Sequence, residues 1–327
     1  HFGATIGLHT GSDTFKRPSI GSWVSYGLGT YNANLPSFMV ISPGLPYAGG
    51  QVWGSDFLPV LHQGTRIIPG PEPIANMHRR KLTAAKQREE LGLLEFFNRK
   101  HLKGRESDSN LRARIKSFET AAGMQTAAPE AFDLTKESES THKLYGLKRG
   151  DTKSFGWQCM VARRLIEHGV RFVQLFNGAY ASGGRINWDG HSKLKEQYDV
   201  HGEILDQPVA GLLRDLKQRG LLENTLVVFA TEFGRMPMFQ AGTYGRDHNP
   251  NGFTAWLAGA GVKGGMSYGA TDPFGFRAQE NPITAHDFHA TILHLLGLDH
   301  EQLTFYHNGI ERRLTNVHGN VIREVLA

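Results

Sequence analysis

The sequence has one cysteine, no long apolar run and no strong excess of charge, and each shortage excludes a class of protein. With Cys159 alone, the chain can form neither an intramolecular disulfide nor a cysteine-rich zinc site, which leaves histidines and carboxylates as metal ligands. No segment reaches the roughly 18 apolar residues of a membrane span, so we predict no transmembrane segment. The hydrophobic content of 39% and the charged content of 20% are typical of a globular protein.

Motifs that bind nucleotides or activate a serine are also missing. The glycine-rich segment 259–265 (GAGVKGG) is not a phosphate-binding loop, and the chain contains no G-x-S-x-G. The net charge is +5, and much of the excess basic charge lies between Met77 and Phe118. No aromatic platform for base stacking is interleaved with these charges, so we interpret them as a solvated helical face and expect no nucleic acid partner. A DNA-associated protein remains an alternative.

Helix and strand patterns alternate regularly in the second half of the chain. A helix is predicted over 154–168 and a strand over 170–176 (VRFVQLF). The next helix covers 193–220 with an interruption at Pro208, and the apolar run 226–230 reads as a parallel strand that is buried on both faces. This order predicts a right-handed crossover in a parallel sheet, and we expect one α/β domain over residues 1–327.

The first half of the chain is less regular. Residues 1–70 are rich in glycine, proline and serine, and we predict loops there apart from one strand over 37–42. A helical insertion or layer is expected over 80–127, followed by a surface connection over 128–152. Near the C-terminus, Thr284 and Asp287 have the spacing of a capping box, which predicts the start of a helix that reaches Leu296.

Three polar clusters follow predicted strands. Because the carboxyl ends of parallel strands meet at one edge of a sheet, we expect the clusters to converge. Their carboxylates and imidazoles suit zinc, and carboxylate-richer sites suit manganese or calcium. Each cluster also has a structural alternative, as a turn, a helix cap or an ion pair. The clusters are Trp188-Asp189-Gly190-His191, Thr231-Glu232-Phe233-Gly234-Arg235 and Arg246-Asp247-His248-Asn249.

The same motifs resemble a known family. WDGH, TLVVFATEFGRMP, GRDHN, AGAGVKGGMSYGATD and HDFHATILHLLGLDH together are similar to the bacterial family called domain of unknown function 1501. That family looks related to the alkaline phosphatase and sulfatase superfamily. The resemblance implies a doubly wound, mainly parallel sheet flanked by helices, truncated at its N-terminus because the chain starts at His1. It also implies metal ions that polarise a phosphate or sulfate ester.

The resemblance assigns roles to particular residues. Arg235 would lie near the ester oxyanion, and the nucleophile is expected upstream of His1. No Cys-x-Pro-x-Arg or Ser-x-Pro-x-Arg sequence is present to form the formylglycine of true sulfatases. The metal ligands that the resemblance implies are Asp189, His191, Glu232, Asp247 and His248.

The function expected from these observations is a metal-dependent hydrolase of phosphate or sulfate esters. Its substrate would be a small-molecule or carbohydrate ester, and its cofactor a divalent metal, zinc first, with calcium or manganese as alternatives. The complete protein is expected to be exported to the periplasm, because family members commonly carry twin-arginine-type signals. The alternative is a non-catalytic binding or cell-surface module on a degenerate phosphatase-like fold. The sequence leaves the oligomeric state open.

Overall fold

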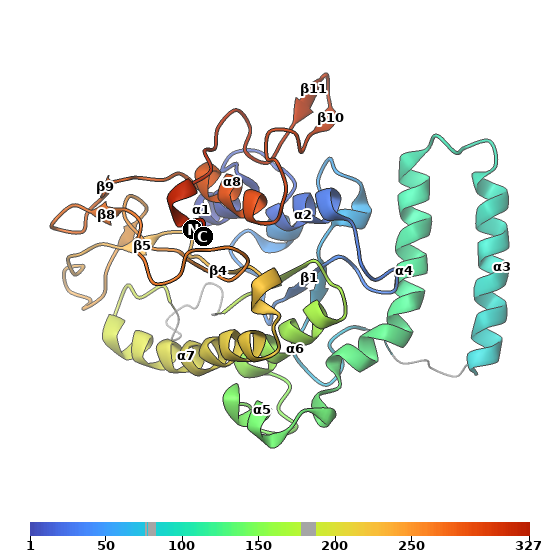
Figure 1. Ribbon diagram of the computed structural model, residues 1–327, viewed down its shortest axis with the longest axis horizontal. Helices are drawn as coiled ribbons and strands as arrows, with labels where there is room; N and C mark the ends of the chain where they lie inside the picture. The colour runs from blue at the N-terminus through green and yellow to red at the C-terminus, as the bar shows by residue number, and fades with distance from the viewer. Residues whose placement is uncertain (76, 78–82, 178–187) are drawn as a thin grey trace.

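A small parallel sheet lies at the centre of a mixed α/β fold (Figure 1). The computed structural model describes residues 1–75, 77, 83–177 and 188–327. Among these residues, the largest sheet has three parallel strands in the order β2-β1-β3. The middle strand, β1 (Phe38–Ile41), pairs with β2 (Thr65–Ile67) and β3 (Phe172–Leu175) and is buried along its whole length. The predicted strands over 37–42 and 170–176 are therefore confirmed.

Side chains of β1 alternate between two apolar clusters because successive residues of a strand point to opposite faces. Met39 and Ile41 share one cluster with residues of α6 (Phe155–Glu167), among them Cys159, which is fully buried. Phe38 belongs to the other cluster, beside Trp53. Two helices border the sheet further out, α2 (Ile20–Leu28) against β3 and α7 (Leu194–Gln218) against α6.

Helix ends follow their local capping signals. The Ser154 side chain accepts a hydrogen bond from the backbone N–H of Trp157 at the start of α6, and the left-handed Gly169 (φ 85°) follows its end. The last helix, α8 (Ala285–Leu295), begins with a complete capping box between Thr284 and Asp287. These ends were predictable because a cap depends on residues only three positions apart.

The apolar run 226–230 is a correction to the prediction. Its strand, β4 (Val227–Phe229), pairs antiparallel with β7 (Trp256–Ala258), and Val228 is 39% exposed. Within the described part of the chain, β3 and β4 lie in separate sheets, so the predicted crossover is wrong. The apolar run is explained by the residues at its ends, Leu226 and Ala230, which pack in the same cluster as α8.

The first seventy residues contain two helices that were predicted as loops. They are α1 (Phe2–Thr10) and α2, whose N-cap is Ser19. Glycines at positions 3 and 7 weaken the helical signal of α1, yet burial of Ile6 and of neighbouring side chains stabilises the helix in the folded chain.

The predicted interruption at Pro208 is also wrong. α7 continues through the proline as one helix of 25 residues. A proline removes one backbone hydrogen bond, and packing along α6 compensates for that loss because Pro208, Leu212 and Leu216 are all buried.

The predicted helical layer is a hairpin of two long helices, α3 (Ala84–Leu102) and α4 (Ser109–Phe132). α4 contacts α6, whereas α3 packs on α4 and lies at the outer edge of the molecule (Figure 1). The segment 128–152 is more structured than the predicted surface connection, because it contains the end of α4 and two short helices, η3 (Leu134–Lys136) and α5 (Glu139–Leu144).

Short two-stranded antiparallel ladders and helical turns complete the fold. The ladders pair β5 with β6, β8 with β9 and β10 with β11. No helix in the described ranges is long and apolar enough to cross a membrane, as the sequence predicted. The bounds are η1 (Gly49–Trp53), η2 (Val60–His62), η4 (Leu222–Asn224), β5 (Gly234–Arg235), β6 (His248–Asn249), β8 (Ala270–Thr271), β9 (Ala278–Glu280), β10 (Phe305–His307), β11 (Ile310–Arg312) and η5 (Arg323–Val325).

Candidate metal centre

The three polar clusters meet through backbone pairing between loops. In the β5–β6 ladder, Arg235 lies opposite His248, which joins the second cluster to the third. The N–H of Arg246 donates to the carbonyl of Gly190 (2.9 Å), which brings in the first cluster. The clusters therefore converge as predicted, and antiparallel contacts between their loops join them.

Four side chains at this junction direct their ligand atoms toward one point. The Nε2 atoms of His1, His191 and His248 lie 3.0, 3.2 and 3.1 Å from Oδ1 of Asp189. The Nε2 atoms of His191 and His248 are 3.0 Å apart, and all four ligand atoms lie within 4.8 Å of one another. We call this group the His3Asp cluster.

The spacing of the His3Asp cluster suits a tetrahedral ion. Zinc bonds of about 2.0–2.1 Å place neighbouring ligand atoms about 3.3–3.4 Å apart, close to the measured separations. Three imidazoles and one carboxylate are also a donor set that zinc favours. Among the described residues, the buried Nε2 atom of His1 has no hydrogen-bond partner, and a bound ion would provide one. The residues present therefore fit a metal ion.

Neighbouring side chains orient the imidazole rings. Oε1 of Glu232 lies 2.7 Å from Nδ1 of His1, and Oε1 of Gln240 lies 3.1 Å from Nδ1 of His191. The ring of Tyr47 stacks on His1 at a centroid distance of 3.9 Å. A hydrogen bond to Nδ1 leaves Nε2 as the nitrogen available to a metal, and such contacts typically strengthen metal binding.

Charge around the cluster sets the protonation states that ligation needs. Burial raises the pKa of Asp189, but hydrogen bonds from Arg235 and His248 outweigh it, and the net pKa lies below its ordinary value. Burial lowers the pKa of His248 below its ordinary value, and the charge of Arg235 adds to this effect while Asp189 opposes it. An ionised carboxylate beside a neutral imidazole is the state that binds a metal.

Comparison with known proteins gives a family and no reaction. Residues 1–326 match the family described as "Protein of unknown function (DUF1501)". The chain belongs to the DUF1501 family. Searches of curated proteins and of solved structures find no match to this DUF1501 chain.

Three of the five metal ligands predicted for the DUF1501 chain lie in the His3Asp cluster, and two lie outside it. Asp189, His191 and His248 lie in the His3Asp cluster, and Arg235 donates from Nη2 to Oδ1 of Asp189 (2.5 Å). Glu232 lies beside the cluster and forms a hydrogen bond with the ring of His1. The fifth predicted ligand, Asp247, accepts a hydrogen bond from the backbone N–H of His248 (2.8 Å) and lies outside the four-residue group.

Sequence reasoning missed His1 in the DUF1501 chain. It precedes α1 and has no spacing relation to the three motifs, so no sequence signal identified it. Two histidines of α8 have structural contacts: His286 forms a hydrogen bond with the carbonyl of Gly11, and His289 with that of Leu8. These two rings anchor α8 to the end of α1.

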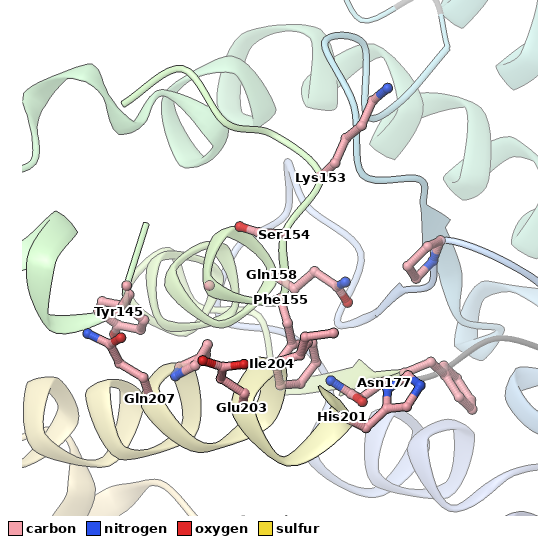
Figure 2. A pocket seen from close by; sticks show the side chains of 15 residues that line it. Tyr145, Lys153, Ser154, Phe155, Gln158, Asn177, His201, Glu203, Ile204 and Gln207 are labelled. Atoms are coloured by element: carbon pink, nitrogen blue, oxygen red, sulfur yellow. The ribbon is translucent and has the colours of Figure 1, made fainter. Parts of the chain in front are cut away.

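A hollow of about 460 Å³ lies between α6 and α7 (Figure 2). Gln158 extends into it from α6 and His201 from α7, and both side chains are more than nine-tenths buried. Oε1 of Gln158 and both ring nitrogens of His201 have no hydrogen-bond partner in the described part of the DUF1501 chain. Asn177 also lines the hollow. Its side chain accepts a hydrogen bond (2.8 Å) from Nε1 of Trp188, the neighbour of Asp189, and so links the hollow to the chain segment that carries Asp189.

Proposed function

We propose that this chain is a zinc-dependent hydrolase of phosphate or sulfate esters whose metal is bound by the His3Asp cluster. The observation that supports the proposal most directly is the convergence of three Nε2 atoms on Oδ1 of Asp189. The motif resemblance described above favours ester hydrolysis over other metal chemistry, and it makes a doubly wound, alkaline-phosphatase-like fold part of the same proposal.

The histidines and the aspartate of the cluster would have different roles. His1, His191 and His248 would donate as neutral imidazoles, and Asp189 would offset part of the ion's charge. When bound, the ion supplies a Lewis acid that polarises an ester oxygen. Calcium and manganese are weaker candidates, because three of the four donors are imidazole nitrogens and these ions prefer oxygen ligands.

Arg235 would help to hold the anionic ester. Its guanidinium lies against the cluster through Asp189, so a sulfate or phosphate oxygen at the metal would lie beside a permanent positive charge. His191 is the most open of the four ligands, with 38% of its side chain exposed, so an ester reaches the cluster from that side. The hollow between α6 and α7, into which Gln158 and His201 extend, would then receive the alcohol portion of a carbohydrate ester.

A non-catalytic binding module is the second candidate, and the contacts of Arg235 favour it. Nη2 of Arg235 donates to Asp189, and Nη1 donates to the carbonyl of Arg246 (3.2 Å). Part of the guanidinium is therefore already engaged within the protein, which suits a metal-bound recognition surface as well as a catalytic one.

Metal loading and ester hydrolysis test the proposal together. We expect the purified chain to bind about one equivalent of zinc after loading and dialysis. The variants Asp189→Asn and His248→Ala should lose most of that metal, whereas His101→Ala, an exposed histidine of α3, should retain it. Aryl phosphate and aryl sulfate esters should be hydrolysed only by metal-loaded protein. Zinc binding without hydrolysis would support the binding module, and failure to retain any divalent ion would contradict both candidates.

A further inference from the structure

The α3 helix exposes apolar side chains that no element in the described part of the chain covers. None of its 19 residues is buried, and in Figure 1 it lies beyond α4 at the outer edge of the molecule. Leu93 is 58% exposed and Phe96 is 60% exposed. Apolar side chains gathered on an uncovered face of a helix indicate an interaction surface.

The helical period shows which residues share the outer face of α3. The side chain of Gln87 donates to that of Gln125 in α4, which identifies the side of α3 that faces α4. At 100° per residue, Leu91 and Leu94 lie on that same inner side. Opposite them lies a row formed by Glu89, Leu93, Phe96 and Lys100, spaced four, three and four residues apart. We call this row the outer stripe.

Two copies of the outer stripe complement each other when they run in opposite directions. Its centre is apolar, its N-terminal end carries Glu89 and its C-terminal end carries Lys100. If a second copy is laid antiparallel, Leu93 meets Phe96 of the second copy and Glu89 meets Lys100 of the second copy, twice by symmetry. A parallel arrangement would place like charges opposite each other, so the charge order specifies the antiparallel one.

We propose that two copies of this chain associate through antiparallel α3 helices, with Leu93 and Phe96 at the centre and the Glu89–Lys100 pairs on either side. The pairing resembles a short coiled-coil seam, in which side chains recur every three to four residues. The next pair outward would be Lys86 with Lys103, two like charges at the exposed helix ends. One helix pair is a small interface, so the dimer should be weak and concentration-dependent.

Sedimentation velocity over a concentration series tests the apolar centre. The unmodified chain should show a monomer–dimer equilibrium, and Leu93→Asp should weaken it at least about tenfold, because a carboxylate would be desolvated at the centre of the seam. Phe274→Asp is the matched control: Phe274 is 76% exposed in the turn between β8 and β9, which lie on the opposite side of the molecule from α3 (Figure 1), so its replacement should leave association unchanged. Circular dichroism should show an unchanged fold in both variants.

Charge exchange tests the antiparallel register. Glu89→Lys and Lys100→Glu should each weaken the dimer, and the double variant should restore it, because the exchanged pair is again of opposite charge. Replacing Lys103 by glutamate should strengthen association by removing the Lys86–Lys103 repulsion. A chain that stays monomeric at every concentration, or a double variant no better than the single ones, would overturn the proposal. Binding of monomers to anionic lipid vesicles, insensitive to the charge exchange, would also overturn it.

Discussion

The Nδ1 atom of His1 lies 2.7 Å from Oε1 of Glu232, so a carboxylate fixes the ring whose Nε2 faces the His3Asp cluster. Glu232 was expected to be a metal ligand. In the structure it instead contacts His1, one of the four residues of the cluster. A carboxylate in this position holds the imidazole tautomer and raises the basicity of the donor nitrogen. The contact thus connects the EFGR motif to the His3Asp cluster, although Glu232 is not one of its four residues.

Replacing Glu232 by glutamine should weaken zinc binding without removing it. The amide keeps nearly the same shape but loses the negative charge, so affinity should fall roughly 10–100-fold. Competition with a chromophoric chelator measures this change. Asp247→Asn is the matched control, because it is the same kind of replacement outside the cluster and its oxygen can still accept from the His248 N–H. Equal losses in the two variants would contradict the role given to Glu232.

Gly245 holds the first and third polar clusters close together. A Cβ atom at this position would lie 2.0 Å from the backbone carbon of His191 and 2.4 Å from the nitrogen of Ser192. Gly245→Ala should therefore displace the loop that carries His191 and reduce zinc affinity in a titration. Gly202→Ala in α7 provides the comparison: a Cβ there meets open space, so metal affinity should stay the same and stability should change by no more than about 1 kcal/mol.

Local signals predicted more of the fold than long-range pairing did. Ser154 and Thr284 marked their helices correctly, because a cap is formed by residues a few positions away. The apolar run at β4 was assigned to the parallel sheet, although its partner is β7, because hydrophobicity alone does not specify the neighbour of a strand. α1 was missed because its stability depends on packing and not on helix propensity.

The candidate site was predictable where its residues lie in motifs. Asp189, His191 and His248 were each expected from a carboxylate and an imidazole close together after a predicted strand, and the structure brings them into one cluster. His1 stands alone in the sequence and joins them only through tertiary contacts. Asp247 directly precedes β6 and its side chain accepts from the backbone N–H of His248, whereas the His248 side chain joins the cluster, because adjacent side chains of an extended segment point in opposite directions.

Arg163 should be critical for stability. It is 1% exposed on α6 and forms ion pairs with Glu137 (2.8 Å), Asp215 (2.9 Å) and Glu167 (2.7 Å). Arg163→Met would remove the most buried cation of this network and leave Glu137 and Asp215 paired only with the less buried Arg164 and Arg219, so the free energy of unfolding should fall by about 3–5 kcal/mol in urea titrations.

The exposed pair between Arg149 and Glu139 gives the control for that measurement. Arg149→Met should cost less than about 1 kcal/mol, because water solvates the charge that is left. A similar loss in both variants would show that burial of the Arg163 network does not determine its contribution.

His289 should make the fold sensitive to acid. The ring is buried, its Nε2 lies 2.6 Å from the carbonyl of Leu8, and burial lowers its pKa to about 4. In the unfolded chain its pKa would be near 6.5, so between these two values the unfolded state binds more protons than the folded state. The contribution of the neutral ring to stability is therefore complete above pH 6.5 and falls progressively as the pH decreases toward 4.

Urea unfolding at pH 7.5, 5.5 and 4.5 should show His289→Gln with a shallower loss of stability than the unmodified chain, because glutamine does not titrate. The exposed replacement His101→Gln should leave the slope unchanged. Parallel pH profiles for all three proteins would rule out His289 as a source of the acid sensitivity.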